Sequence, residues 1–282
     1  MLDYRLNTFL KLCDTMNYHR TAELLHMTQP AVTQHIHYLE NKYQTKFFMY
    51  DGRNLKKTEE AREFESYARS AQYNESIFLK KVSNKKMITL RIGATKTIGE
   101  YVITDQVSKI LDSQNYTLSL SISNTEHLLF LINQNKLDFA IIEGFFSKKD
   151  YDYKFYKNES FVGVCSKTHP FANKNVSFED IFKETLIVRE EGSGTREIFE
   201  QILNQKNYTL DNFKKIVCIS SFKLIKEIVL SKDIITFAYE SIPNSDENLS
   251  YFTIEDNDYI REFNYVYLKN ANARNYISVF EG

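Results

Sequence analysis

Residues 18–40 constrain the fold of this chain more than any other stretch, because they predict two short helices joined by a tight turn. Thr28 is a good N-cap for the second helix, since its hydroxyl can accept a hydrogen bond from the free amides of the next turn. Pro30 falls in that first turn, where its missing N–H costs nothing. Apolar residues then recur at spacings of four and three, which predicts a stripe that faces inward. The stripe consists of Val32, Ile36 and Leu39.

The polar side chains of this second helix are left facing outward near its start. They are Gln29, Thr33, Gln34 and His37. In helix-turn-helix proteins that end of the recognition helix enters the major groove of DNA. Side-chain amides can bond adenine in a bidentate manner, and a small group such as that of Ala31 can contact a thymine methyl. The spacing alone leaves open an ordinary helical hairpin with a solvated polar face.

The residues in and around this helix resemble one known family. The run Thr28-Gln29-Pro30-Ala31-Val32-Thr33, followed by Ile36 and Leu39-Glu40, is similar to the recognition helix of the LysR-type transcriptional regulators. Flanking positions that agree with the family are Phe9 and Leu10, Ala22 and Leu25, Phe47-Phe48, Arg53 and Thr58. The resemblance implies a winged helix-turn-helix over residues 1–58. It also implies DNA contacts from Tyr18, Thr28, Gln29, Pro30, Ala31, Thr33, Gln34, His37 and Arg53.

Several positions depart from the family pattern. Tyr50 stands where an arginine is usual, Thr21 replaces an alanine, and Glu60-Ala61 replaces the usual Ala-Gly. His35 and His37 occupy positions that often hold Gln and a basic residue. These changes leave the fold intact but weaken the expected hold on phosphates, so the target sequence does not carry over from the family.

Residues 58–82 contain neither Gly nor Pro and carry a periodic pattern at alternating spacings of three and four. The pattern predicts a long helix whose seam pairs with a second copy in a two-helix coiled coil. The seam consists of Ala61, Phe64, Ala68, Ala71, Glu75, Phe78 and Val82, with Glu75 as its polar exception. A single amphipathic helix lying on its own domain is the alternative. We expect residues 59–87 to form this linker helix and a charged hinge at Asn84-Lys85-Lys86.

From residue 88 the pattern changes to strands that alternate with helices. Predicted strands at 88–93, 116–123 and 137–143, with helices at 99–112 and 125–134, form a βαβαβ unit of parallel strands. A similar set follows, with strands near 161–166, 186–189, 216–219 and 234–238 and helices near 178–183, 195–205 and 222–231. A strand at 262–268 would return the chain to the first unit, before a final helix near 272–281. The pattern therefore predicts two α/β lobes with a cleft between them.

This half resembles the effector domain of the same regulators, which is itself similar to type II periplasmic binding proteins. The resemblance implies an effector domain over residues 88–282. Its lobe I would comprise 88–162 and 266–282, and its lobe II 163–265. Residues 90–101 and 190–197 look most similar to the regulators of sulfur assimilation and of carbon fixation, which indicates a small anionic metabolite as effector.

Polar loops occur where predicted strands turn into helices, at 94–99, 124–125 and 192–196. Backbone amides, hydroxyls and the positive end of a helix dipole converge at such points, which suits a carboxylate, sulfate or phosphate. In the family the corresponding positions line the inducer cleft, which implies effector contacts from Thr95, Thr97, Thr125, Ser193 and Thr195. Helix capping is the alternative role for Thr97, Thr125 and Thr195. Glu143 would face the same opening, where its carboxylate would either select against a fully anionic ligand or bond an amine or hydroxyl on it. Lys96 is expected to point to solvent.

Charge and cysteine content agree with an intracellular DNA-binding protein. The first 87 residues hold 14 basic against 10 acidic residues, and the remainder 22 against 27, so the positive end is the predicted DNA-binding end. Cys13, Cys165 and Cys218 are odd in number and set among apolar neighbours, which predicts reduced core residues in a cytoplasmic protein. No apolar run approaches the ~18 residues that span a bilayer, and no secretory signal follows Met1.

Other classes of function find little support. The sequence has no nucleophile elbow, no metal-spaced His/Asp cluster and no phosphate-binding Gly-rich loop. We therefore expect no catalytic site, no metal site and no cofactor. A solute-binding module of the type II periplasmic fold without a regulatory role is the alternative. The N-terminal 87 residues count against it, as does the lack of a signal peptide.

The sequence thus predicts an α+β multidomain protein with a winged helix-turn-helix, a long dimerisation helix and a two-lobed α/β effector domain. The predicted function is sequence-specific transcriptional regulation, modulated by a small anion between the lobes. The expected partners are double-stranded DNA, the effector, and a second copy bound through residues 58–82, with further assembly into a homotetramer. RNA polymerase is a candidate partner, and no membrane is expected.

Overall fold

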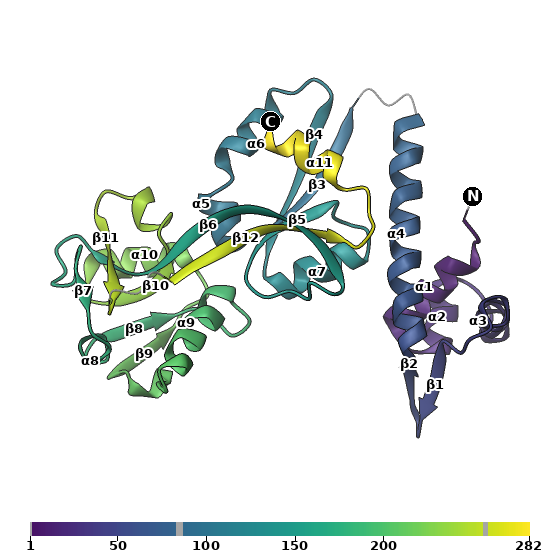
Figure 1. Cartoon of the computed structure of the whole chain (residues 1–282), viewed down its shortest axis with the longest axis horizontal. Coiled ribbons are helices and arrows are strands. Elements are labelled where there is room, and N and C mark those ends of the chain that lie inside the picture. Colours follow the sequence, from purple (N-terminus) through teal and green to yellow (C-terminus); the bar gives the residue numbers. More distant parts are fainter. Residues whose placement is uncertain (1, 83–86, 256–258) are drawn as a thin grey trace.

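The computed structural model describes residues 2–82, 87–255 and 259–282. The N-terminal part contains three helices, a β-hairpin and a long helix (Figure 1). These are α1 Arg5–Thr15, α2 Tyr18–Leu24, α3 Gln29–Tyr43, β1 Phe48–Asp51, β2 Asn54–Lys57 and α4 Glu59–Val82. Thr28 caps α3 as predicted, because its Oγ1 accepts a hydrogen bond from the Ala31 amide at 3.4 Å. The predicted hinge at 84–86 lies outside the described residues.

Aromatic rings form the centre of the N-terminal core. Phe9 packs edge-on against Phe47 and Phe64, with ring centroids 5.0 and 4.9 Å apart, and Phe47 stacks on Phe64 at 4.7 Å. Such pairs contribute about 0.5–1.5 kcal/mol each beyond their buried area. The predicted stripe of α3 closes this core, because Ile36 and Leu39 have no exposed surface. The outer face of α3 is thereby fixed toward solvent.

Two buried polar side chains fasten the hairpin to the helices on either side of it. Glu40, near the end of α3, accepts a hydrogen bond from the Phe47 amide at 2.9 Å. Thr58 caps α4, accepting from the Ala61 amide at 3.1 Å while donating to the Lys46 carbonyl at 2.7 Å. These bonds hold the hairpin and α3 in one fixed relation.

Helix α4 is a single helix of 24 residues, as the pattern predicts, but its predicted seam is shared between two roles. Ala61, Phe64 and Ala68 pack into the N-terminal core of the same chain. Phe78 and Val82, at the other end of the seam, are 61% and 59% exposed. The expectation of one uninterrupted seam is therefore wrong for its first half, because those positions already cover the helix-turn-helix core.

A second face of α4 lies against the C-terminal half of the chain. Arg69 pairs with Asp14 of α1 at 2.7 Å and donates to the Asn133 carbonyl at 2.6 Å. Tyr73 donates through its hydroxyl to Asp138 at 3.2 Å. Asp138 also accepts from the Arg91 amide and guanidinium at 2.8 and 2.5 Å, and its carboxylate has no exposed surface. This cluster joins the linker helix to the sheet behind it.

The C-terminal half is built on one ten-stranded sheet, in the order β4-β3-β5-β12-β6-β10-β8-β9, with β11 also pairing with β6 and β7 pairing with β11. Its strands are β3 Ile88–Thr95, β4 Tyr116–Ser123, β5 Phe139–Glu143, β6 Tyr151–Ser166, β7 Asn175–Val176, β8 Thr185–Val188, β9 Lys215–Cys218, β10 Ile235–Tyr239, β11 Leu249–Ile254 and β12 Tyr259–Leu268. Its α-helices are α5 Lys96–Tyr101, α6 Thr104–Leu111, α7 Thr125–Asn133, α8 Phe178–Ile181, α9 Gly194–Gln205, α10 Phe222–Ser231 and α11 Arg274–Glu281. Two 3₁₀ turns complete it, η1 Leu210–Asn212 and η2 Pro243–Ser245.

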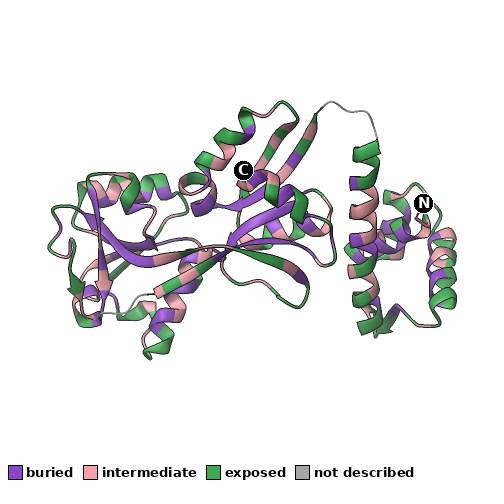
Figure 2. Ribbon diagram, turned by 45° about the horizontal axis from the view of Figure 1, so that its top comes forward, coloured by how far each residue is buried: buried purple, intermediate pink, exposed green. Residues whose placement is uncertain are grey.

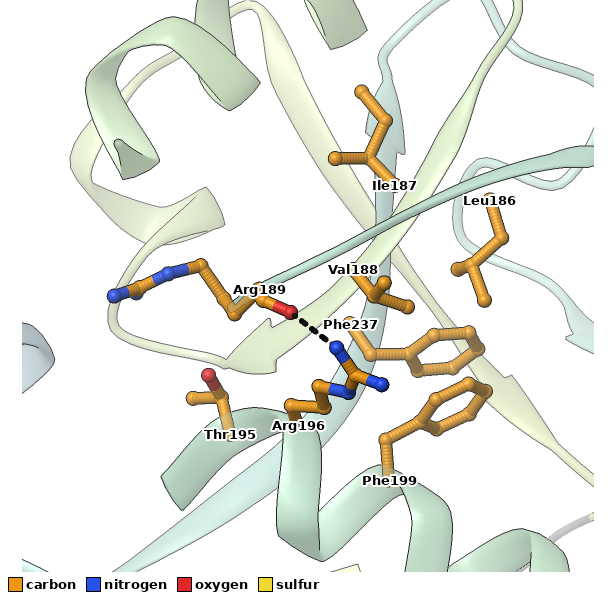
Figure 3. A pocket seen from close by; sticks show the side chains of 8 residues that line it. All are labelled: Leu186, Ile187, Val188, Arg189, Thr195, Arg196, Phe199 and Phe237. Atoms are coloured by element: carbon orange, nitrogen blue, oxygen red, sulfur yellow. Dashed lines mark hydrogen bonds between the residues drawn. The ribbon is translucent and has the colours of Figure 1, made fainter. Parts of the chain in front are cut away.

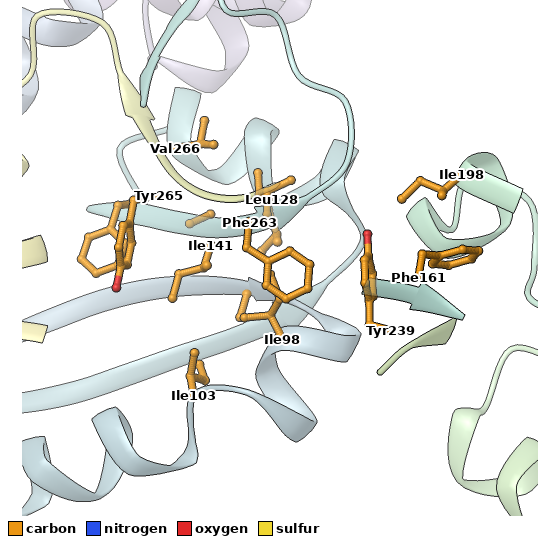
Figure 4. Packing of buried hydrophobic residues seen from close by; sticks show 14 of the residues in the cluster. Ile98, Ile103, Leu128, Ile141, Phe161, Ile198, Tyr239, Phe263, Tyr265 and Val266 are labelled. Carbon is orange, nitrogen blue, oxygen red and sulfur yellow. The ribbon is translucent and has the colours of Figure 1, made fainter. Parts of the chain in front are cut away.

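Two lobes are joined by the long strands β6 and β12 (Figure 1). Lobe I surrounds β3, β4 and β5, which are parallel as the βαβαβ pattern predicts. Lobe II surrounds β8, β9 and β10, which are also parallel to one another. Buried residues concentrate along the central strands (Figure 2), and one apolar cluster continues from Ile141 in lobe I past Phe263 to Ile198 in lobe II (Figure 4).

The structure differs from the sequence prediction at several elements. The helix expected at 99–112 is two helices, because the chain turns at Val102–Ile103 between α5 and α6. Strand β6 begins at Tyr151, ten residues before the predicted start, and β7 and β11 were not predicted. Cys218 is exposed rather than in the core, because β9 is the edge strand of the sheet. None of the helices among the described residues is both long and apolar enough to cross a bilayer.

Candidate functional sites

The outer face of α3 presents a continuous polar surface. Gln29, Pro30, Gln34 and His37 are exposed, and together with the half-buried Thr33 they line one open surface. Ala31 is half-buried at the first turn of the same helix. The structure therefore brings together the residues that the sequence predicts for reading bases.

The free hydrogen-bonding capacity of these residues is unequal. Thr33 donates its hydroxyl to the Gln29 carbonyl at 3.1 Å, and the Thr28 hydroxyl is engaged as the cap of α3. His35 turns toward α1, where its Nδ1 lies 2.9 Å from the Thr8 hydroxyl. The side-chain amides of Gln29 and Gln34 remain the groups best suited to bidentate contact with a base.

The two remaining predicted DNA contacts come from outside α3: Tyr18 precedes it in the sequence and Arg53 follows it. Tyr18 is half-buried, its ring packs against Phe48 at 6.5 Å, and burial raises the pKa of its hydroxyl to about 12. Arg53 is exposed at the turn between β1 and β2, where Gly52 takes a φ of +61° that side chains rarely adopt. The position of Arg53 at a hairpin tip suits contact with a phosphate backbone.

Between the lobes, residues from both sides converge on one hollow with an empty volume of about 270 Å³, part of it open to solvent. Lobe I contributes the loops after β3, β4 and β5, and lobe II contributes the loop before α9. The residues that line it are Thr95, Lys96, Ser123, Asn124, Thr125, Glu143, Arg189, Glu190, Ser193 and Gly194. We refer to this set as the interlobe cleft.

The predicted effector residues divide into two groups. Thr95, Thr125, Glu143 and Ser193 line the interlobe cleft directly. Thr97 and Thr195 are buried behind it; the Thr195 hydroxyl lies 2.9 Å from that of Ser193. None of the three threonines at 97, 125 and 195 is the N-cap of its helix, because those positions are Thr95, Asn124 and Ser193. The capping alternative is therefore wrong for them.

Glu143 is the most deeply buried ionisable group of the interlobe cleft. Burial raises the pKa of its carboxyl to about 7, although hydrogen bonds from Thr95 and Thr97 and the charge of Arg189 act in the opposite direction. Near neutral pH this carboxyl is thus divided between a neutral form that donates a hydrogen bond and an anionic form that repels an anion.

Two basic side chains that the sequence did not assign to ligand binding meet at Glu190. Lys96 does not point to solvent as expected: its Nζ lies 2.8 Å from Glu190 Oε1 and so joins lobe I to lobe II. Arg189, only 5% exposed, donates to the same carboxylate at 2.9 and 3.1 Å. Burial raises the pKa of Glu190, but the bonds from Arg189 and Lys96 outweigh it and bring the pKa to about 2.

The environment of Arg189 fixes its direction. Figure 3 shows its side chain extending away from Phe199 and Phe237, which stack with ring centroids 3.9 Å apart. Its backbone carbonyl accepts a hydrogen bond from Arg196 at 3.4 Å. At Gly194, a Cβ would come within 3.2 Å of the Glu143 carbonyl, so glycine permits the close approach of the two lobes. The sequence did contain a signal for Arg189: it is the last residue of the strand predicted at 186–189, and the loop with Gly192 and Gly194 follows directly.

Comparison with known proteins bears on both sites. Residues 4–62 match the family model described as "Bacterial regulatory helix-turn-helix protein, lysR family", and residues 85–281 match "LysR substrate binding domain". The HTH-type transcriptional regulator CysL of Bacillus subtilis is 27% identical over 80% of this chain and 76% of its own length. The RuBisCO operon transcriptional regulator of Allochromatium vinosum is 25% identical over 73% of this chain and 70% of its own. A full-length OxyR structure from Pseudomonas aeruginosa superposes with a TM-score of 0.63 at 19% identity, covering 99% of this chain and 93% of that one.

Proposed function

Because the chain belongs to the LysR family of transcriptional regulators, we propose that α3 reads an operator and that a small anion in the interlobe cleft controls it. The family's role is regulation of transcription through DNA rather than catalysis. The match over residues 4–62 also counts against the alternative of a solute-binding module with no regulatory role.

We further propose that the protein acts as a homodimer through residues 58–82 and that dimers associate into a homotetramer, with RNA polymerase as a further partner. What supports the dimer is an apolar surface on α4 that the described part of the chain leaves exposed. It consists of Tyr67, Phe78, Leu79 and Val82, each between 56% and 61% exposed. A partner helix would cover this surface and place two copies of α3 on two half-sites.

Replacing Arg53 by glutamine should weaken binding to every duplex by a similar factor, because a phosphate contact carries no sequence information. The slope of log affinity against log salt should become shallower by about one unit. Fluorescence anisotropy with operator and scrambled duplexes at several salt concentrations measures both quantities. Lys183→Gln, which removes an exposed charge in lobe II, is the control and should change neither. A loss confined to the operator would instead assign Arg53 to base reading.

The proposal for the ligand rests on the convergence of Ser123, Thr125 and Ser193 with the buried cation Arg189 around one hollow. Hydroxyls, a guanidinium and helix N-termini are the groups that bind sulfate, phosphate or carboxylate in proteins. The resemblance to regulators of sulfur assimilation and carbon fixation supports the same class of small anion. In its anionic form Glu143 would then accept a hydrogen bond from an amine or hydroxyl on the ligand. In its neutral form it would donate a hydrogen bond to the anion.

Replacing Thr125 by valine together with Ser193 by alanine should abolish the response of operator binding to the effector and leave binding without effector unchanged. Both side chains line the interlobe cleft, so the ligand would lose two hydroxyl partners. Within the protein, the change at Ser193 removes the hydrogen bond between its hydroxyl and that of Thr195. The measurement is footprinting of the operator with and without sulfate, phosphate and acetate, which represent the three classes of anion that such a site binds. Thr253→Val, a hydroxyl removed from β11, is the matched control. A full response in the double variant would exclude the interlobe cleft as the effector site.

Affinity for a fully charged anion should fall as the pH rises from 6 to 8, because Glu143 ionises beside it. With a pKa of about 7, the neutral form dominates at pH 6 and the anionic form at pH 8. If only the neutral form accepts the anion, the loss approaches about tenfold, and Glu143→Gln should make the affinity independent of pH over this range. Because the pKa is raised from 4.5, the contribution of Glu143 to folding stability is present below pH 4.5 and is lost as the pH rises through 7. Calorimetric titration with sulfate at pH 6, 7 and 8 measures the change in affinity. Identical pH profiles for the unaltered protein and Glu143→Gln would refute the role of Glu143 in it.

A further inference from the structure

Two cations and two acids line the interlobe cleft, namely Lys96, Arg189, Glu143 and Glu190. Both cations bond to the same acid, Glu190, whereas Glu143 bonds to Thr95. The donors best suited to a small anion are therefore already engaged by a carboxylate of the protein itself.

The bonds between Arg189 and Glu190 have the geometry of a bound anion. Arg189 donates from Nε to Glu190 Oε2 at 2.9 Å and from Nη2 to Oε1 at 3.1 Å. Such a pair of parallel bonds is how arginine binds carboxylate and phosphate ligands. The Lys96 ammonium adds a third bond, 2.8 Å long, to the same Oε1. An anion that used these donors would have to replace the Glu190 carboxylate.

Glu190 is also the more accessible member of its pair with Arg189. Its side chain is 32% exposed and that of Lys96 37%, against 5% for Arg189. Burial raises the pKa of Glu190, but the bonds from Arg189 and Lys96 outweigh it and bring the pKa to about 2. Glu190 is therefore anionic at pH 6 and above, and its charge opposes the entry of a second anion.

The bond between Lys96 and Glu190 joins the two lobes. Lys96 is the first residue of α5 in lobe I, and Glu190 follows β8 in lobe II. Displacement of Glu190 from Lys96 would remove this link. Occupation of the cleft and separation of this ion pair are thus coupled events.

We propose that Glu190 is an internal competitor of the effector, whose carboxylate occupies Arg189 and Lys96 until an oxyanion of higher charge, such as sulfate or phosphate, displaces it. This inference rests on the proposed function, in which a small anion binds in the interlobe cleft. A monocarboxylate brings no more charge than Glu190, and it competes with a carboxylate that the chain holds beside Arg189. Glu190 thereby selects for dianions and sets the concentration at which they bind.

The first test is calorimetric titration of the full chain with sulfate at pH 6, where most of Glu143 is neutral and Glu190 is anionic. Glu190→Gln should bind sulfate roughly five- to thirtyfold more tightly than the unaltered protein, because a partly exposed ion pair no longer has to be broken. The matched control is Glu191→Gln. This neighbour is 92% exposed and pairs with Arg196 at 3.9 Å, so the same change of charge there should alter the affinity by less than about twofold.

Acetate tests the selection for dianions. It should bind the unaltered protein much more weakly than sulfate does, and Glu190→Gln should gain measurable affinity for it. A gain of affinity in a variant cannot result from a loss of folded protein.

The second test detects the displacement itself. A carbodiimide joins an amine and a carboxylate that are in contact, so it should link Lys96 to Glu190, and mass spectrometry of peptides identifies the product. Sulfate should lower the yield of this crosslink, whereas chloride at equal ionic strength should not. The similarly exposed ion pair of Lys154 and Glu281, 2.6 Å apart, is the matched control, and its crosslink should be unaffected by sulfate.

The outcomes separate this inference from the proposed function. If Thr125→Val with Ser193→Ala abolishes sulfate binding but Glu190→Gln binds no more tightly than Glu191→Gln, the cleft remains the anion site and only the role of Glu190 is overturned. A crosslink between Lys96 and Glu190 that persists at saturating sulfate overturns the same role, as does acetate binding as tight as that of sulfate. If neither the unaltered protein nor Glu190→Gln binds sulfate at millimolar concentration, both the anion site and the internal competitor are excluded.

Discussion

Replacing Gln29 and Gln34 together by alanine should lower affinity for the operator by at least about 30-fold, while binding to scrambled duplex changes by less than about twofold. Each bidentate contact to a base contributes about 1–3 kcal/mol of discrimination, so two of them together account for a loss of about 2–6 kcal/mol. The two amides are exposed on the outer face of α3, and neither helps to hold the N-terminal core. The loss is therefore one of recognition rather than of stability.

The operator for this measurement can be selected from random duplexes with the unaltered protein, after which both proteins are titrated on selected and scrambled DNA at one salt concentration. Gln205→Ala removes an exposed amide at the end of α9 and is the matched control. An equal loss on selected and scrambled DNA would show that Gln29 and Gln34 contact phosphates. In that case bases would be read by other residues of α3.

Replacing Asp138 by alanine should lower the free energy of unfolding by about 3–5 kcal/mol, the usual result of removing one partner of a buried ion pair. The carboxylate has no exposed surface, and it accepts bonds from Arg91 and from the Tyr73 hydroxyl of α4. Without it the guanidinium of Arg91 and the Tyr73 hydroxyl would both lack their main partner. The change affects the contact between the linker helix and lobe I as well as lobe I itself.

Chemical denaturation measured by circular dichroism tests this expectation, with Asp180→Ala as the control. Asp180 forms an exposed ion pair with Lys183, and its loss should leave stability nearly unchanged. Tyr73→Phe removes only the bond from α4 and should cost about 1 kcal/mol. If Asp138→Ala were no more destabilising than Tyr73→Phe, the charge of Arg91 would have to be satisfied elsewhere.

The elements that the sequence predicted well are those with strong local patterns. Thr28 followed by Pro30 and an apolar stripe specifies the start and the buried face of α3, because capping and a 3.6-residue period act within a few residues. The strand at 116–123 was predicted at its observed bounds for a similar reason, since apolar and polar residues alternate along it. Such signals do not depend on what the rest of the chain does.

The first half of β6 was missed because its stability comes from distant pairing. Residues 151–160 mix aromatic, charged and amide side chains, and they are a strand because they pair with β12, about a hundred residues later. The break between α5 and α6 is likewise set by packing: a Cβ at Gly99 would meet Ile122 of β4 at 2.8 Å, so α5 lies close to that strand. Neither feature has a local signature that outweighs its alternatives.

For the interlobe cleft, the sequence determined which loops carry hydroxyls at the starts of helices, because a strand followed by a helix places those positions at one edge of the sheet. The tertiary structure decided which of them face the hollow, with Thr125 and Ser193 lining it and Thr97 and Thr195 behind it. It also decided the roles of Lys96 and Arg189, whose shared partner Glu190 belongs to the other lobe from Lys96. The physical reason is range: periodicity and capping act over a few residues, whereas burial and ion pairing depend on groups that β6 and β12 bring together from far apart in the chain.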